Sequence, residues 1–520
     1  MAAKEKKNFL VHGSILAMAG ILVRVIGMFY RIPLMNIIGS EGNGIYSVAF
    51  NIYNIALVLS SYGLPMAVSK LISERIAKEE YRNAKKLFRA SLVISFITGG
   101  LACFILFAGS GIFEKIYKGV SGLAIPLKVL APTLLVVAVM GVVRGFFQGQ
   151  GNMIPTAMSQ LIEQVMNAFV SVFAAYVLVK THASSQDLAA YGAAGGTLGT
   201  LMGAASGFLF LLLLLISKMG AFNYEVKHDK LSQDLDQKLL YKMIIITVVP
   251  IIIGQTLYQI SAVIDDMMFS NIMAKTLSDS KIKSDLGNFA SSYSLLISIP
   301  QGVASAMSAS MLPSVVESYT KGERKAVRRK IGNTITTNMF VAFPSFVGLL
   351  VLGKPIIKLL FSRYDANQGA VMLYLGAIAV VFYTLSTVSS SALQGVDRMN
   401  IPVKHSGISL LVHIVLVYLL LRWSGLGIYA IVIGNASFPC LIFILNFKSL
   451  KKITGFRFNY KISVMVPLVS ALAMGLTTKI TYNLVYSLVK INFIALVFAM
   501  AVAFVTYAAM LMQFKKRNMY

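Results

Sequence analysis

Long apolar runs recur along the whole chain and constrain its fold more than any other feature. A helix needs about 20 apolar residues to cross the hydrocarbon core of a bilayer, and most of the runs reach that length. The sequence therefore predicts an all-α polytopic membrane protein with about fourteen transmembrane helices. The runs are Leu10–Ile38, Ile45–Val68, Ala90–Phe113, Val129–Val143, Met153–Val179, Leu188–Ile216, Met243–Ile264, Phe289–Met311, Ile335–Leu352, Val371–Leu393, Ser406–Leu421, Ile428–Leu445, Ile462–Leu484 and Ile491–Met512.

The composition excludes a soluble enzyme. Of the 520 residues, 57% are hydrophobic and 13% are charged, and the mean hydropathy is +0.74. The longest gap between runs, Lys218–Lys242, is a charged loop too short for a soluble domain. The first run is not a cleaved signal peptide, because it is too long, contains Arg24 and lacks a small-residue cleavage site. Cys103 and Cys440 both fall in predicted spans, so neither a disulfide framework nor a cysteine metal site is expected.

The net charge of +27 is distributed asymmetrically across the predicted membrane. With a cytoplasmic N-terminus, the cytoplasmic segments hold 32 of the 47 Lys and Arg residues and the external loops hold 13. This asymmetry follows the positive-inside rule, so both termini are expected in the cytoplasm. The basic loops then serve topology and contact with anionic membrane lipids, and no nucleic-acid partner is expected.

The second half of the chain echoes the first at an interval of about 245 residues. Gly42-Asn43 recurs as Gly287-Asn288, and Leu64-Pro65 recurs as Leu312-Pro313, each followed by a basic loop. Six spans separate equivalent features, so the halves would point the same way through the membrane, as in transporters built from parallel repeats. We predict an N-terminal lobe at residues 1–220, a C-terminal lobe at 221–450 and two further spans at 451–520. Chance similarity between apolar segments is the alternative.

Two arginines lie inside the first apolar run. A charged side chain at bilayer depth costs at least a few kcal/mol. Arg24 and Arg31 are seven residues apart, so they project from one helix face about 10 Å apart. Such a pair is tolerated where it faces a water-filled cavity or an anion. The pair therefore predicts an anion-receiving cavity, although Arg31 could instead reach the interface near Pro33.

The fifth run carries a polar face. Gln160, Glu163, Gln164, Asn167 and Ser171 follow one another at helical spacing. This face must look into protein or water rather than lipid, and its carboxylate is a candidate partner for an arginine of the first run. Two roles stay open for that carboxylate: a structural counter-ion, or a proton relay or gate.

The seventh run carries a second set of polar residues. Gln255 and Gln259 lie one turn apart, and Asp265 and Asp266 follow at its end. Carboxylate oxygens suit a coupling cation, so the two aspartates are a candidate sodium site. Ordinary aspartates at a helix end are the alternative.

No catalytic constellation accompanies these polar residues. The sequence contains no Walker-type glycine loop, no HExxH motif and no CxxC pair. Asp265 and Asp266 are adjacent rather than facing, so they do not form an intramembrane protease dyad. The chain is not expected to be an enzyme or to carry a cofactor; energy would come from a sodium or proton gradient or from the membrane potential.

Two motifs resemble a known family. One is Arg24-Val25-Ile26-Gly27; the other runs from Tyr293 through Pro300-Gln301-Gly302-Val303 to Met311-Leu312-Pro313-Ser314. Together with the parallel layout, they resemble the multidrug/oligosaccharidyl-lipid/polysaccharide exporter superfamily, in its branch of MurJ-type lipid II flippases and stage V sporulation protein B-like proteins. The resemblance covers essentially the whole chain.

The resemblance implies two lobes forming a V around a cationic cavity that receives a lipid-linked diphosphate. Arg24 matches the family's span-one arginine, Arg31 lies one position from a second, and Asp265 or Asp266 resembles a sodium-ligating aspartate of some members. The family's flippases also carry arginines in spans two and eight, where this chain has none. That departure leaves the substrate open.

Four functions are therefore hypotheses. The first is a flippase in the bacterial cell membrane that moves undecaprenyl-diphosphate-linked peptidoglycan precursor outward by alternating access. The second is a flippase for another lipid-linked oligosaccharide, such as a capsule or teichoic precursor. The third is a cation-coupled drug exporter, against which fourteen spans count. The fourth is a scaffold for cell-wall synthesis proteins, which would also be the partners of a peptidoglycan-precursor flippase.

Overall fold

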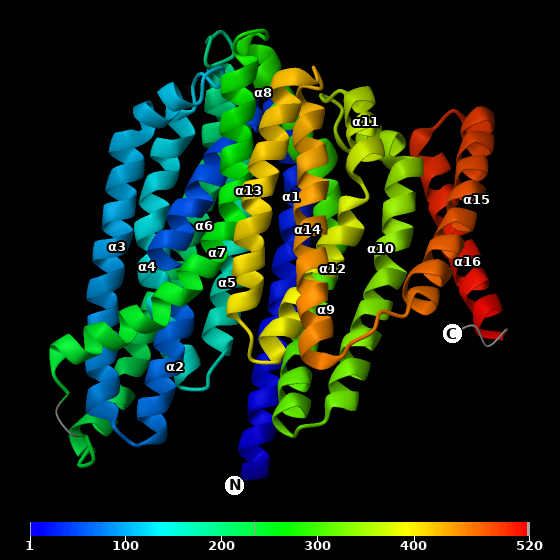
Figure 1. Cartoon of the computed structure of the whole chain (residues 1–520). Helices are drawn as coiled ribbons and strands as arrows, with labels where there is room; N and C mark the ends of the chain where they lie inside the picture. Colours follow the sequence, from blue (N-terminus) through cyan, green and yellow to red (C-terminus); the bar gives the residue numbers. More distant parts are fainter. Residues whose placement is uncertain (1, 233–234, 517–520) are drawn as a thin grey trace. The chain divides into compact units, whose positions relative to one another are not determined.

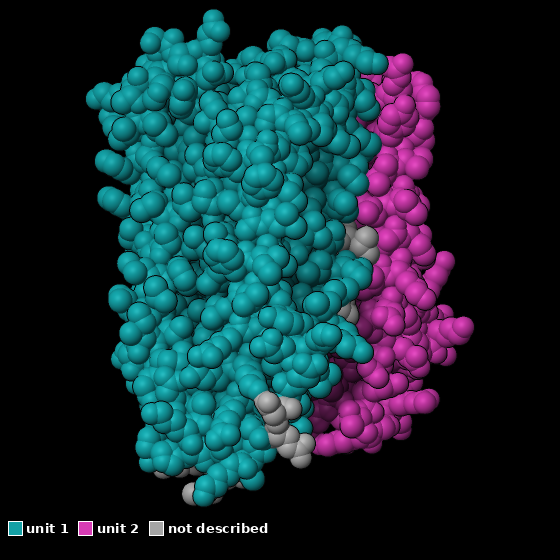
Figure 2. Space-filling model, turned by 90° about the vertical axis from the view of Figure 1, so that its left-hand side faces the viewer, with its two compact units in different colours: residues 1–287 teal, residues 288–520 magenta. Residues whose placement is uncertain are grey.

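The computed structural model describes residues 2–232 and 235–516, and the side chains of 2–17, 21, 250, 251, 254, 257 and 258 lie outside the description. These described parts are helical, with no strand among them, which confirms the all-α prediction. The chain divides into two compact units, Met1–Gly287 and Asn288–Tyr520, coloured separately in Figure 2. The units reflect internal packing, and the lobe boundaries at residues 220 and 450 remain predictions.

Unit 1 is built from long helices (Figure 1). They are α1 (Ala2–Leu57), the short π-helix η1 (Val58–Tyr62), α2 (Leu64–Ala77), α3 (Tyr81–Ile116), α4 (Ala124–Gly149), α5 (Ile154–Thr181), α6 (Leu188–His228), α7 (Gln237–Met273) and α8 (Asp279–Asn288), whose last residue belongs to unit 2.

Unit 2 contains a second set of helices (Figure 1). They are the π-helix η2 (Phe289–Leu295), α9 (Leu296–Thr320), α10 (Arg324–Leu360), α11 (Ala366–Gly376), α12 (Ala379–Gly395), α13 (Asn400–Trp423), α14 (Ile428–Thr454), the π-helix η3 (Lys461–Met465), α15 (Val466–Val489) and α16 (Asn492–Lys516).

Every apolar run of the sequence lies in one helix or in consecutive helices, to within a residue at its ends; the second run extends from α1 through η1 into α2. Eleven helices of the described chain are long and apolar enough to cross a membrane, or twelve if the bent pair α11 and α12, at 47°, forms one span. That number counts Met18–Ala77 once, although it holds the first two runs, and omits α7. The protein is therefore a multi-pass membrane protein.

α1 consists of two helices that meet at a kink. Gly39 has φ 70° and ψ −179°, a conformation that glycine adopts without a steric penalty. The sequence predicts a loop between Ile38 and Ile45, but the helix resumes directly after the kinked residue. A kink at Gly39 thus takes the place of the loop that the sequence predicts between the first two runs.

Small residues bring α5 and α6 into close contact. Gly195, Gly199 and Gly203 of α6 are four residues apart, and a Cβ on any of them would collide with α5. Helices in lipid gain little from hydrophobic burial, so close packing of small residues becomes a main source of their association. This packing fixes the helix that carries the polar face.

The two Gly-Asn motifs of the repeat meet inside unit 1, where α1 crosses α8. A Cβ on Gly44 would collide with the backbone of Lys283, and one on Gly287 would collide with the backbone of Ser40. Asn43 Nδ2 donates to the Gly287 carbonyl at 2.8 Å. The crossing is therefore a backbone-to-backbone contact that only glycine permits.

Unit 2 is organised around buried polar groups that find partners. The Tyr293 hydroxyl donates to the Gly376 carbonyl at 3.1 Å and to Asn435 Oδ1 at 3.2 Å. The buried His413 contacts the Gly434 carbonyl through Nδ1 at 3.1 Å. These contacts tie η2, α11, α13 and α14 together.

The last two spans attach to α10. Tyr507 donates to the Phe340 carbonyl at 2.9 Å, and Asn492 donates to the Pro355 carbonyl at 2.9 Å. α15 and α16 pack against each other along their length (Figure 1). The pair is thus held to unit 2 by polar contacts at more than one depth.

Replacing Gly44 with Ala tests the crossing. The added Cβ would force α1 and α8 apart, so we expect a loss of about 1–3 kcal/mol of stability, as for other overpacked sites. Thermal unfolding in detergent measures it. Gly100→Ala in α3 is the matched control, because nothing lies within 4 Å of its Cβ. An equal or higher melting temperature for Gly44→Ala than for the wild type would contradict the crossing.

Candidate functional site

The two predicted arginines lie in the first half of α1 and differ in burial. Arg24 is exposed and Arg31 is half-buried. Arg31 lies beside Tyr30 and Tyr46, whose side chains are 8% and 4% exposed. The second arginine therefore lies beside two buried tyrosines inside the bundle.

Helix α5 lies against this part of α1. A Cβ on Gly27, between the two arginines, would lie 3.1 Å from Gln164 Nε2. Asn167 Nδ2 points to the Tyr30 hydroxyl at 3.4 Å, and the Asn167 side chain also accepts from Ser171 at 2.8 Å. The polar face of α5 thus looks into protein, as the sequence predicts. Gln160 lies half-buried near the start of the same face.

Glu163 pairs with Arg144 of α4, an arginine that lies outside the predicted apolar runs. Arg144 Nη2 donates to Glu163 Oε2 at 2.7 Å, and Arg144 Nε donates to Ser159 Oγ at 2.9 Å. Their side chains are 13% and 29% exposed, Arg144 being the more buried. The carboxylate, proposed from sequence as a partner for span one, is thus neutralised by the neighbouring helix α4.

Arg144 is the residue that sequence reasoning missed. The fourth apolar run ends at Val143, so the sequence predicts a loop position for Arg144. The structure continues α4 to Gly149, and Phe146 and Phe147 are almost completely buried. Those two aromatic residues were the available signal that the helix, and hence the arginine, continues into the bundle.

The polar residues of α7 separate into two groups. Gln255 is half-buried and Gln259 is exposed, and among the described side chains no contact places either of them beside the arginines. Asp265 and Asp266 are each only 5% exposed, and Asn51 of α1 donates to Asp266 Oδ2 at 2.8 Å. Within the described residues no group of three or more His, Cys, Asp or Glu side chains could hold a metal ion. A cation there would rest on two carboxylates and neighbouring oxygens.

The charged side chains described above, on α1, α4 and α5, form what we call the polar cluster of unit 1, and positive charge is in excess among them. Arg24, Arg31 and Arg144 supply three guanidinium groups, and Glu163 supplies one carboxylate, which Arg144 engages. Guanidinium groups keep their charge and match phosphate oxygens bidentately. The arrangement can hold an oxyanion beside α1 and contains no nucleophile and base in contact.

A family model described as "Polysaccharide biosynthesis protein" matches residues 9–319, more than half of the chain. The chain belongs to this polysaccharide biosynthesis protein family. A second model, described as MatE, matches residues 250–419. Both findings confirm the resemblance to the exporter superfamily that the motifs of α1 and α9 predict.

Relatives of this family member cover nearly its whole length. Lipid II flippase MurJ of Bacillus subtilis (strain 168) is 27% identical over 484 residues, 90% of this chain and 87% of the relative. Stage V sporulation protein B of the same organism is 22% identical over 460 residues, 88% and 86% of the two chains. A structure of lipid II flippase MurJ in an inward closed conformation matches with a TM-score of 0.72 at 14% identity, covering 97% and 99%.

A double-mutant cycle tests the Arg144–Glu163 pair. Arg144→Leu leaves a carboxylate unpaired among helices, so we expect a loss of roughly 1–3 kcal/mol, and adding Glu163→Leu should recover much of it. Chemical unfolding in detergent gives the coupling energy. The exposed pair Lys78–Glu74, at 3.3 Å, is the matched control and should show little coupling. Additive effects at Arg144 and Glu163 would refute the pairing.

Proposed function

We propose that this protein is a flippase that carries an undecaprenyl-diphosphate-linked peptidoglycan precursor from the inner to the outer leaflet by alternating access. The single observation that carries the proposal is Arg24, an exposed guanidinium inside a helix long and apolar enough to span the membrane. The likeness of this chain to MurJ of Bacillus subtilis, at 27% identity, supports the same substrate class.

The arginines of α1 and the amide side chains of α5 and α7 match the chemistry of the proposed substrate. A lipid-linked diphosphate has an anionic head that must cross hydrocarbon while its tail stays in lipid. Arg24 would meet the diphosphate first because it is exposed, and Arg31 would meet it one step deeper on the same helix. Gln160, Asn167, Gln255 and Gln259 would offer neutral donors and acceptors to the sugar and phosphate groups.

Glu163 then has a specific role in this proposal. Its pairing with Arg144 removes a negative charge that would repel the diphosphate. The same pair also fixes α5 against α4, which keeps Asn167 next to Tyr30. Glu163 would therefore act as a structural counter-ion, and the arginines of α1 would serve the substrate.

The setting proposed for this cycle is the bacterial cell membrane, with both termini in the cytoplasm and cell-wall synthesis proteins as partners. The excess of Lys and Arg in the segments on one side supports that orientation. A sodium or proton gradient, or the membrane potential, would supply the energy.

A second candidate is a flippase for another lipid-linked oligosaccharide. The likeness to stage V sporulation protein B, at 22% identity, and the absence of arginine from Ile45–Val68 and Phe289–Met311 favour it. The diphosphate contacts would be the same, so the two candidates differ only in the sugar. The lipid-linked species that accumulates when the protein is depleted separates them.

Arg24→Ala tests the proposed diphosphate contact. Removing charge-assisted hydrogen bonds should slow exposure of lipid II on the outer leaflet by about 10- to 100-fold. A lipid II accessibility assay in a flippase-depleted strain measures this, with membrane levels of the protein checked in parallel. Arg422→Ala, at an exposed position in the last turn of α13, should rescue fully. Full rescue by Arg24→Ala would eliminate the proposed contact.

The paired change Asp265→Asn and Asp266→Asn tests sodium coupling. Neutral amides cannot balance a cation's charge, so transport by the variant should no longer respond to sodium concentration. Transport into vesicles at several sodium concentrations measures the response. Asp279→Asn, exposed in the first turn of α8, is the control and should keep it. An unchanged sodium response in the double variant would exclude these aspartates as the coupling site.

A further inference from the structure

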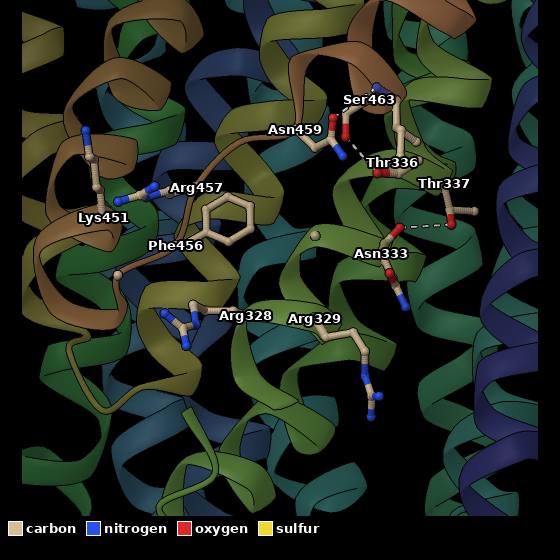
Figure 3. Close-up of a pocket in the computed structure, with 13 residues that line it drawn as sticks. Arg328, Arg329, Asn333, Thr336, Thr337, Lys451, Phe456, Arg457, Asn459 and Ser463 are labelled. Atoms are coloured by element: carbon tan, nitrogen blue, oxygen red, sulfur yellow. Dashed lines mark hydrogen bonds between the residues drawn. The ribbon is translucent and has the colours of Figure 1, made fainter. Parts of the chain in front are cut away.

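Unit 2 contains a cavity of about 1080 Å³ surrounded by basic side chains. It lies between the first part of α10, the last turn of α14 and the segment that leads into η3 (Figure 3). Arg328, Arg329, Lys451 and Arg457 line it, and its lining contains no Asp or Glu. All of its lining residues belong to unit 2, whereas the candidate transport site belongs to unit 1.

The segment that carries Arg457 is held in place on both sides of the arginine. Phe456 is 4% exposed and packs edge-on against Phe447, with ring centroids 6.2 Å apart. The Phe456 amide donates to Thr454 Oγ1 at 3.1 Å. On the other side, the Ile462 amide donates to Asn459 Oδ1 at 3.2 Å. Arg457 therefore projects from an ordered turn.

Arg328 is placed by the same turn. Gly455 ends α14 with φ 69°, and a Cβ on it would lie 3.3 Å from Arg328 Nη1. The guanidinium thus packs over a residue that has no side chain. Across the cavity, the Thr336 and Ser463 hydroxyls are 2.7 Å apart and join α10 to η3, as Figure 3 shows.

The charges of this cavity are not balanced by acidic neighbours. None of its four cationic side chains forms an ion pair with any residue that the structure describes. The basic loop of unit 1 differs, because Arg75 pairs with Glu80 at 2.8 Å. There, Asn83 also donates to Glu80 at 3.1 Å, and these contacts hold the pKa of Glu80 below its usual value against the opposing effect of burial. Gathering like charges around a hollow is unfavourable unless an anion enters it.

We propose that this cavity binds the phosphate group of a phosphate ester. Arginine binds phosphate bidentately, lysine adds a point charge, and the Asn333 amide and Thr337 hydroxyl can donate to the remaining oxygens. Setting topology requires positive charge but does not require a preformed cavity.

The position of the cavity indicates two sources of such an ester. The cavity lies at the ends of helices long enough to span a membrane: α14 ends at its wall, and η3, continued by α15, begins there. Phospholipid phosphates lie at the depth where spans end, and anionic headgroups are attracted to basic residues there. A soluble phosphate ester from the adjoining aqueous phase has the same charge and the same oxygens. The experiment therefore includes both.

Binding is measured on the full chain in phosphatidylcholine nanodiscs. One arm adds fluorescent phosphatidylglycerol, and the other titrates glycerol 1-phosphate by calorimetry. The wild type should bind at least one probe, and the double change Arg328→Gln and Arg457→Gln should weaken that binding about tenfold or more. Lys515→Gln with Lys516→Gln, exposed in the last turn of α16, removes the same net charge and should bind as the wild type does.

Each result supports or overturns the proposal. Binding of phosphatidylglycerol alone assigns the cavity to lipid headgroups, and binding of glycerol 1-phosphate assigns it to soluble esters as well. No binding of either probe, or equal losses in the two double variants, overturns it. Should the arginine double variant fail to fold, Lys451→Gln replaces it, because that side chain is exposed; binding as strong as in the wild type then counts against the site.

Discussion

The cost of a charge inside the bilayer is the constraint on which the rest of unit 1 depends. Arg144 and Glu163 meet that cost by pairing at 2.7 Å across α4 and α5. The pairing turns the polar face of α5 toward protein, and the glycines of α6 close behind it. With α5 in this position, Asn167 reaches Tyr30, and the arginines of α1 lie beside an ordered polar surface. Helix packing and the chemistry of the site therefore have one physical origin.

Hydropathy was sufficient to predict the helices because lipid demands long apolar segments, and each run became a helix. Contacts between helices were harder to predict from the sequence. The partner of Glu163 could not be deduced, because pairing depends on which helices become neighbours, and Arg144 lay one residue beyond an apolar run. The kink at Gly39 could not be predicted either. It follows from a single backbone torsion, and a loop and a kink have similar amino-acid compositions. The arginines of α1 were predictable because charge in an apolar run is rare.

The two units differ in whether their clustered basic side chains have acidic partners. In unit 1 Arg75, at the basic loop after α2, pairs with Glu80, and Arg144 pairs with Glu163. In unit 2 the four cations around the cavity form no ion pair with any described residue, and an ordered aromatic turn carries one of them, Arg457. Under the two proposals the protein has two anion-binding surfaces: one on a membrane-spanning helix, suited to a moving substrate, and one in the cavity of unit 2, suited to a resident ligand.

The crossing of α1 and α8 also affects how the chain is made. Asn43 and Gly287 are separated by 244 residues, so the ribosome must add almost half of the protein after Asn43 before the two can meet. At about 5–20 residues per second, that interval is on the order of 10–50 s. During this time the amide of Asn43 and the bare backbone of Gly44 have no final partner and must be accommodated by the insertion machinery or by water. The first helix to enter the membrane thus reaches its final packing only after α8 has been made.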